Sequence, residues 1–113
     1  MPAYAYRPTE HFTSRLEKIQ RYDPGGYERV MKVVGRLLEH PGDSDGRMHG
    51  RLREKFKKYV GRGDYRVLYY YCELCRKAEH RLREECRSCS SLPDNSVVFF
   101  DVFHKNEKEK LHY

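Results

Sequence analysis

The segment from residue 51 to residue 72 constrains the fold of this chain more than any other. Phe56, Lys58 and Val60 alternate with Lys57 and Tyr59, a break with two glycines follows at 61–64, and residues 65–71 are rich in aromatic and β-branched residues. This pattern predicts two antiparallel strands joined by a tight turn. Arg66 then lies on the second strand, where a charge is held in a more definite position than on a loop.

Side chains alternate between the two faces of a strand, so the predicted hairpin has two different surfaces. Arg66 is expected to share one face with Leu68 and Tyr70. The other face is expected to carry the remaining residues of the second strand, Tyr65, Val67, Tyr69 and Tyr71.

The same segment holds most of the positive charge. It contains seven basic and two acidic residues, a net charge of +5, whereas the whole chain of 113 residues has +6. A pI near 9.2 with the charge gathered on one hairpin favours a polyanionic partner, such as RNA, DNA or an acidic protein segment.

Length and composition indicate one compact domain over residues 1–113. An apolar content of 38% with 35% charged residues is normal for a globular domain and unlike a disordered chain. No run approaches the ~18 apolar residues of a membrane span, and the first twelve residues lack the apolar core of a signal peptide. We therefore expect a cytoplasmic protein with no membrane partner.

Two helices are predicted ahead of the hairpin. A short alternating strand at 3–6 ends at Arg7-Pro8, and Thr9 can cap a helix with one apolar stripe. Asp23-Pro24-Gly25-Gly26 separates it from a second helix, which ends at His40-Pro41, and Asp23 is expected to form an Asx-type turn or the N-cap of that helix. The apolar positions of the two helices are Phe12, Leu16 and Ile19, followed by Val30, Val33, Val34, Leu37 and Leu38.

The run from Ser96 to His104 is the most strand-like in the chain and is apolar at positions of both parities, which predicts a central strand. The charged segment 105–111 closes the chain as a short helix or tail. The predicted class is α+β, in the order strand, helix, helix, then three strands.

All four cysteines fall in two CxxC pairs within residues 72–95, between two predicted strands, with the first pair expected to continue the preceding strand. A structureless loop of that length is uncommon in a small domain. Four thiolates around one structural Zn²⁺ would close it as a zinc knuckle, and metal binding would contribute to its folding. The alternatives are two disulfides, an iron centre or an uncoordinated loop. The proposed ligands are Cys72, Cys75, Cys86 and Cys89.

Several stretches resemble the RelE/ParE toxin superfamily, and more closely its RelE and HigB-like branch. The likeness covers the chain except about residues 73–95, so the four-cysteine insertion lies outside it. The hairpin sequence GDYRVLYY is fairly specific to the superfamily, although it does not separate its nucleases from its gyrase poisons. The matching stretches are 37–41 (LLEHP), His49-Gly50, 59–69 (YVGRGDYRVLY) and 102–108 (VFHKNEK).

The resemblance implies a RelE-like fold, in which two helices pack on a small, mostly antiparallel sheet with a short C-terminal helix. It implies the toxin of a type II toxin–antitoxin system, an mRNA interferase that cleaves mRNA on the ribosome as an endoribonuclease. The expected partners are a cognate antitoxin that covers the basic surface, the ribosome and mRNA, with no small-molecule substrate. The alternatives are a ParE-like inhibitor of DNA gyrase and a non-catalytic zinc-knuckle protein that binds nucleic acid.

RNA cleavage by attack of the 2′-OH needs a base, an acid and cations that stabilise charge developing at phosphorus. Arg66 is suited to the last task, and the resemblance puts it at the position of the family's catalytic strand arginine. The resemblance also puts His104 and Lys105 at the place of a second basic pair, in which His104 would act as general acid or base and Lys105 would contact phosphate. The residues expected to hold the RNA backbone are Lys55, Lys57, Lys58 and Arg62.

Each of these residues also has a purely structural interpretation. Arg66 could pair with Asp64 or Asp101 and stabilise the sheet, and His104 could simply end a strand. Lys57 and Lys58 could be edge-strand lysines that oppose aggregation. The chain also departs from the family, because Lys105 stands where an arginine is usual and the only downstream tyrosine is Tyr113.

Overall fold

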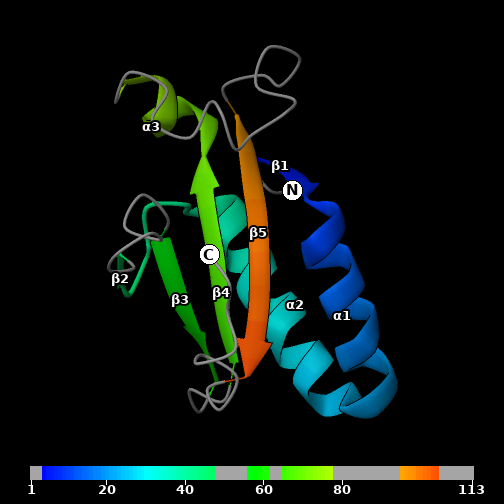
Figure 1. Ribbon diagram of the computed structural model, residues 1–113. Coiled ribbons are helices and arrows are strands. Elements are labelled where there is room, and N and C mark those ends of the chain that lie inside the picture. The colour runs from blue at the N-terminus through cyan, green and yellow to red at the C-terminus, as the bar shows by residue number, and fades with distance from the viewer. Residues whose placement is uncertain (1–3, 48–55, 62–64, 78–94, 105–113) are drawn as a thin grey trace.

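The computed structural model describes residues 4–47, 56–61, 65–77 and 95–104 (Figure 1). The predicted C-terminal helix lies outside these ranges. The elements in chain order are β1 (Ala5–Pro8), α1 (Glu10–Tyr22), α2 (Pro24–Glu39), β2 (Gly46–Arg47), β3 (Phe56–Val60), β4 (Tyr65–Tyr71), α3 (Cys72–Lys77) and β5 (Ser96–His104).

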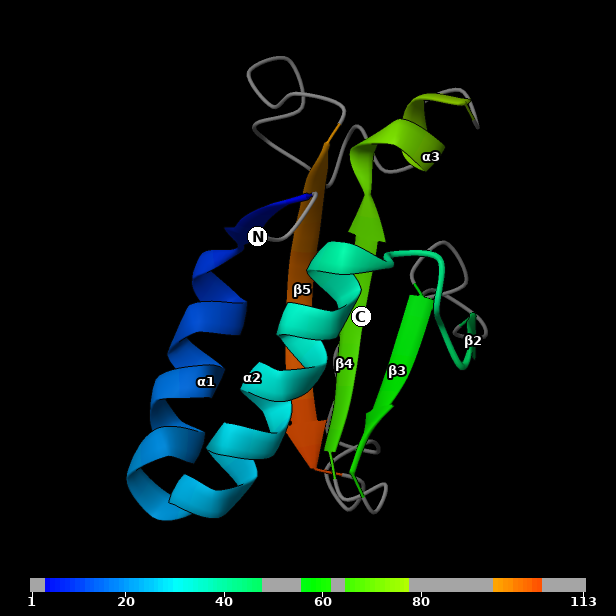
Figure 2. The same cartoon turned by 180° about the vertical axis from the view of Figure 1, so that it is seen from behind.

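The five strands form one mixed sheet in the order β1-β5-β4-β3-β2. β1 pairs with β5 in parallel, and the other pairs are antiparallel. The predicted hairpin is confirmed as β3 and β4, and β5 is a central strand as predicted. Helices α1 and α2 both lie on one face of the sheet, as the two opposite views show (Figures 1 and 2). We call this the inner face, and the face away from α1 and α2 the outer face.

Both helices begin at the predicted caps. The hydroxyl of Thr9 accepts a hydrogen bond from the backbone N–H of Phe12 at 3.1 Å, and the carboxylate of Asp23 accepts one from Gly26 at 3.1 Å. Such caps satisfy N–H groups that have no partner within the helix. Pro24 suits the first turn of α2 because proline lacks the N–H that would be unpaired there. Asp23 therefore both ends α1 and starts α2.

The apolar stripes of α1 and α2 pack on the inner face. Phe12 of α1 lies with its ring centre 5.3 Å from that of Phe99 on β5. Val30 and Leu37 of α2 are fully buried in the same cluster as Tyr69 of β4. Burial of a side chain of this size contributes roughly 1.5–3 kcal/mol relative to exposure, so this layer accounts for much of the stability of the fold.

Two elements differ from the prediction. Residues 72–75 do not continue the strand but begin helix α3. Glutamate, leucine, arginine and lysine are good helix formers, and an ion pair of 3.2 Å between Glu73 and Lys77 spans one turn. The short strand β2 was not predicted, because two residues carry no periodicity and it forms only through pairing with β3. No helix in the described part of the chain is long and apolar enough to cross a membrane.

Candidate nucleic-acid interface

Arg66 lies on the outer face, near the turn end of β4. It is directly opposite Tyr59 of β3 and Phe103 of β5 in the strand register, and directly opposed residues share a face. Its side chain is half-buried, and its guanidinium carbon lies 4.8 Å from the centre of the Tyr59 ring. The arginine is therefore not sealed within the core.

Lys57 completes a group of three residues on the outer face. It is two positions from Tyr59 on β3 and holds its ammonium nitrogen 5.5 Å from the centre of the same ring. A hydrogen bond from Lys57, the charge of that lysine and the nearby charge of Arg66 lower the pKa of the Tyr59 hydroxyl. The Tyr59 side chain is 38% exposed. We call Lys57, Tyr59 and Arg66 the outer cluster.

Lys58 points the other way, as the alternation of β3 requires. It is opposite Val67 on the inner face, and its ammonium nitrogen lies 3.4 Å from Asp43 and 3.5 Å from Asp45. The other carboxylate oxygen of Asp45 accepts a hydrogen bond from the backbone N–H of Tyr59 at 2.7 Å. Asp45 therefore fixes both the backbone of β3 and the lysine beside it.

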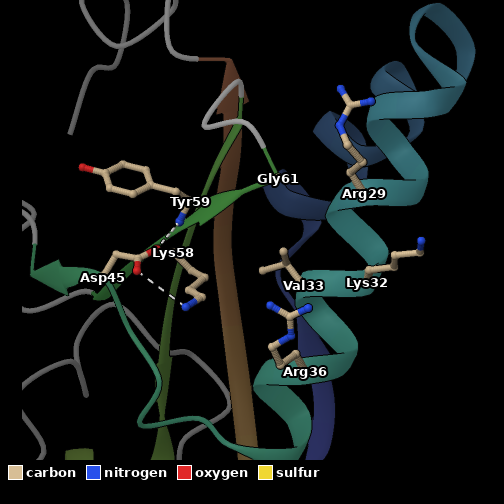
Figure 3. A pocket seen from close by; sticks show the side chains of 8 residues that line it. All are labelled: Arg29, Lys32, Val33, Arg36, Asp45, Lys58, Tyr59 and Gly61. Carbon is tan, nitrogen blue, oxygen red and sulfur yellow. Dashed lines mark hydrogen bonds and ion pairs between the residues drawn. The ribbon is translucent and has the colours of Figure 1, made fainter.

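A cleft of about 400 Å³ lies between α2 and β3. We call it the inner cleft. Figure 3 shows Arg36 on the side of α2 that faces β3 and Lys32 extending from α2 away from β3, while the ring of Tyr59 points away from α2. The lining residues are Arg29, Lys32, Val33, Arg36, Asp45, Lys58, Tyr59 and Gly61.

His104 and Arg66 do not share a face. His104 is opposite Tyr65, and the two rings meet edge to face with centres 5.3 Å apart. The Tyr65 hydroxyl donates a hydrogen bond of 2.8 Å to Asp23 at the start of α2, which puts both rings on the inner side. Successive residues face opposite ways where the strand register is regular, as it is at this end of β5, so the order Phe103-His104 separates this histidine from the outer cluster.

Asp101 is fully buried and is bound from α1. Its carboxylate lies 3.1 Å from the Nε2 atom of His11 and 3.7 Å from the Nε atom of Arg15. It also accepts a hydrogen bond from the backbone N–H of Val102. This carboxylate therefore anchors α1 to β5. The other predicted site residues, Lys55, Arg62 and Lys105, together with Asp64, lie outside the described residues.

Two of the four cysteines are described. Cys72 and Cys75 lie three positions apart in the first turn of α3, and both are buried and free of disulfide bonds. Residues at i and i+3 lie on the same side of a helix. Cys86 and Cys89 lie outside the described residues, and within the described ranges no group of three or more potential ligands lies together.

Tyr59 and the basic residues of α2 were not predicted as site residues. Tyr59 resembled an ordinary strand tyrosine, since its position between two cations depends on pairing with β4. The helix residues had a visible signal: Arg29, Lys32 and Arg36 follow the i, i+3, i+7 spacing of one helix face. Only the packing of α2 beside the hairpin in the folded structure shows that this face of the helix lines the same cleft as Lys58.

Comparison with known proteins gives a likeness in structure. No family model matches the chain, and no curated protein matches it. The chain is similar to the crystal structure of the RelBE2 toxin–antitoxin complex from Mycobacterium tuberculosis, with a TM-score of 0.59 and 24% identity. The match covers 93% of this chain and 94% of that chain. The predicted RelE-like α+β fold is therefore confirmed.

Proposed function

We propose that this protein is the toxin of a type II toxin–antitoxin pair and cleaves mRNA on the ribosome as an endoribonuclease. The observation that carries the proposal is the outer cluster, in which a strand-held arginine and a lysine flank an exposed tyrosine. The likeness in fold to a structure that contains a toxin and its antitoxin supports the same function.

The proposed reaction needs no metal at the phosphate. The 2′-oxygen attacks phosphorus while its proton passes to a base, and the bond from phosphorus to the 5′-oxygen breaks. The departing 5′-oxygen takes up a proton from solvent water, leaving a 2′,3′-cyclic phosphate and a free 5′-OH. The reaction therefore requires a base, a proton donor, for which water serves here, and at least one cation at the phosphate.

Arg66 would hold two phosphate oxygens through its planar guanidinium, since five fixed N–H donors match that geometry. Lys57 would add a second positive charge on the same side. Tyr59 would accept the proton of the 2′-OH, because the two cations beside it lower its pKa and so increase the fraction of phenolate that can take up a proton. His104 has no part in this proposal, because its side chain lies on the inner side.

Expression in bacteria tests this function. Induction of the wild-type chain without an antitoxin is expected to stop growth and translation, with mRNA cut within reading frames as mapped by primer extension. Arg66→Ala is expected to abolish both effects. Arg21→Ala removes an exposed arginine of α1 and is expected to remain toxic. If cells tolerate the wild-type chain, the proposal is wrong.

The same experiment separates the alternative of gyrase inhibition. An inhibitor of gyrase would induce the DNA-damage response and leave mRNA intact. A non-catalytic nucleic-acid-binding protein would bind RNA in a salt-sensitive manner and cut neither RNA nor DNA. Arrest with intact transcripts would therefore exclude the nuclease.

We propose a cognate antitoxin as the protein partner. An exposed set of cations is best covered by an acidic segment, and the similar solved structure is itself a toxin–antitoxin complex. Co-expression with the neighbouring reading frame is expected to restore growth and to yield a complex that co-purifies. A toxic chain that no neighbouring gene product neutralises would contradict this partner.

We also propose a structural Zn²⁺ bound by Cys72, Cys75, Cys86 and Cys89. Support comes from the first two cysteines, whose reduced thiols share one side of the first turn of α3. Thiolates of this kind favour Zn²⁺, and four of them leave no open position for catalysis. The metal would then stabilise residues 72–95 rather than take part in RNA cleavage.

A further inference from the structure

The inner cleft is positively charged. Its lining contains four basic residues and one carboxylate, Asp45, which gives a formal net charge of +3. Lys58 is largely neutralised, because Asp43 and Asp45 both lie within 3.5 Å of its ammonium nitrogen. The excess charge therefore belongs to α2.

Three cations of α2 follow one another along the cleft. Arg29 and Arg36 are seven residues apart with Lys32 between them, which corresponds to roughly 10 Å of helix at 1.5 Å per residue. Lys32 and Arg36 are exposed, and neither forms an ion pair within the described part of the chain. Two solvent-exposed cations therefore lie at the cleft, where they can bind an anion.

Gly61 allows the hairpin to approach this helix closely. A Cβ atom at Gly61 would come within 3.0 Å of the Arg29 side chain, and the residue has a φ of +50°, in the left-handed region. Arg29 therefore lies against the turn that joins β3 to β4. The basic residues of α2 therefore extend, at Arg29, as far as the hairpin that carries the outer cluster.

The chemistry of the cleft favours an extended phosphodiester over a protein helix. A helix that binds in a groove inserts apolar side chains into apolar pockets. Here the aliphatic member of the lining is Val33, which is itself only 5% exposed, and the Tyr59 ring is directed away. Guanidinium groups, by contrast, match the paired oxygens of a phosphate.

We infer that the inner cleft is a second binding site for single-stranded nucleic acid, in which Lys32 and Arg36 bind backbone phosphates beyond the site of cleavage. Lys57 and Lys58 are adjacent on β3 and face opposite sides of the sheet, so one strand separates the outer cluster from the cleft. β2 pairs with β3 at Phe56 and Lys57, so a chain that crosses β3 beyond that pairing, at Tyr59 and Val60, would engage both. The inference rests on the proposed function only in taking RNA as the ligand.

The test uses the full chain and a fluorescent 12-nucleotide 2′-O-methyl RNA, which lacks the attacking hydroxyl and cannot be cut. The Lys32→Glu/Arg36→Glu variant is expected to bind at least tenfold more weakly at 0.1 M salt. Each lost phosphate contact lowers the slope of log K against log salt by about 0.7 for a single strand, so a decrease of roughly 1.4 is expected. A DNA oligonucleotide of the same sequence is expected to respond in the same way.

The matched control is Lys18→Glu/Arg21→Glu, which makes the same change of charge on exposed positions of α1 outside the cleft. It is expected to weaken binding less than threefold and to leave the slope unchanged. Equal effects of the two variants would show that only global charge matters and would overturn the inference. A second result would also overturn it. If Lys32→Glu/Arg36→Glu weakens binding of a fluorescent 12-residue polyglutamate but not of the oligonucleotide, the cleft binds an acidic peptide and not nucleic acid.

The outcomes for the cleft and for the nuclease are distinguishable. Arg66→Ala is expected to abolish cleavage and to retain the difference in oligonucleotide binding between the cleft variant and its control. Loss of that difference with cleavage intact would overturn the cleft alone. Absence of cleavage with the difference retained would overturn the nuclease alone.

Discussion

The guanidinium carbon of Arg66 lies 4.8 Å from the centre of the Tyr59 ring, across the two strands of the hairpin. A contact of this kind at a solvent-accessible position contributes about 0.5–1 kcal/mol. The pair is thus a weak structural contact, and its larger consequence is to hold a cation and a phenol side by side. Stability and activity should therefore respond very differently to the same substitution.

Replacement of Arg66 by lysine or alanine is expected to lower cleavage of ribosome-bound mRNA by about 100- to 1,000-fold, because one donor at a developing charge contributes roughly that much. The free energy of unfolding should fall by no more than about 1 kcal/mol. Single-turnover cleavage and urea unfolding measure the two effects. If cleavage falls only in proportion to the fraction of folded protein, Arg66 has a structural role and not a catalytic one.

Tyr59 should be the tyrosine that ionises first. Its ordinary pKa is about 10, and both neighbouring cations favour the phenolate. Absorbance at 295 nm is expected to show one early transition that Tyr59→Phe removes. Lys57→Gln is expected to shift that transition to higher pH, because it removes the largest cause. An early transition that persists in Tyr59→Phe would contradict the assignment.

Gly26→Ala is expected to destabilise the protein by roughly 1–3 kcal/mol through overpacking. A Cβ there would come within 2.7 Å of the Tyr65 ring and closer still to the Asp23 carboxylate. Gly35 provides the control on the same helix, since its Cβ would meet nothing within 4 Å. Gly35→Ala is expected to stabilise by about 0.5–1 kcal/mol, as alanine does in an exposed helix. If thermal unfolding shows that both variants change the stability in the same direction, the close packing around Gly26 is contradicted.

The Asp23 carboxylate should make part of the free energy of unfolding depend on pH in the acidic range. A hydrogen bond from the Tyr65 hydroxyl and one from the Gly26 N–H lower the pKa of this carboxyl below its ordinary value of 3.8. A lowered pKa stabilises the folded state above the unfolded value, and this stabilisation is lost as pH falls through the folded value. The stability difference between wild type and Tyr65→Phe is therefore expected to be largest at neutral pH and to shrink below about pH 4.

Tyr69→Phe is the control for this pH dependence. The Tyr69 hydroxyl donates a hydrogen bond of 2.6 Å to the Pro41 carbonyl, which does not titrate. Its effect on urea unfolding should be the same at pH 7 and at pH 3. A Tyr65→Phe difference that is equally constant would show that the hydrogen bond does not favour the carboxylate.

Purified protein is expected to contain one zinc ion per chain, and Cys72→Ser or Cys75→Ser should remove it. Chelation should lower the melting temperature, because a structural metal contributes to folding. Elemental analysis and calorimetry measure both. If the protein contains iron and has the colour of an iron–thiolate centre, the site binds iron and not zinc. If the protein contains no metal and chelation leaves its stability unchanged, the proposed metal site is excluded.

Much of the fold follows from local signals. Thr9 and Asp23 were identified as helix caps because a cap needs only the N–H groups two or three residues away. The strands of the hairpin followed from alternation, which is equally local. The fate of residues 72–75 was predicted incorrectly, since their position after a strand favoured continuation while their composition favoured a helix.

The site could be predicted only in part. Arg66 was predicted as a site residue because its position in the hairpin and its neighbours in sequence are characteristic, and the structure places it beside Tyr59. His104 was assigned to the same site, but the register with β4 puts it beside Tyr65 instead. A shift of one residue reverses the face of a strand side chain, and register depends on partners far away in the sequence.

The sequence by itself determined α1 and α2, their caps, the basic hairpin and the central strand, because each depends on contacts within a few residues. Only the tertiary structure decided that Lys57 meets Tyr59 and Arg66 while Lys58 meets α2. Which helix covers which face of a sheet is set by packing between distant segments, and no local pattern contains that information. The separation of one run of basic residues into an outer cluster and an inner cleft is therefore a property of the folded chain.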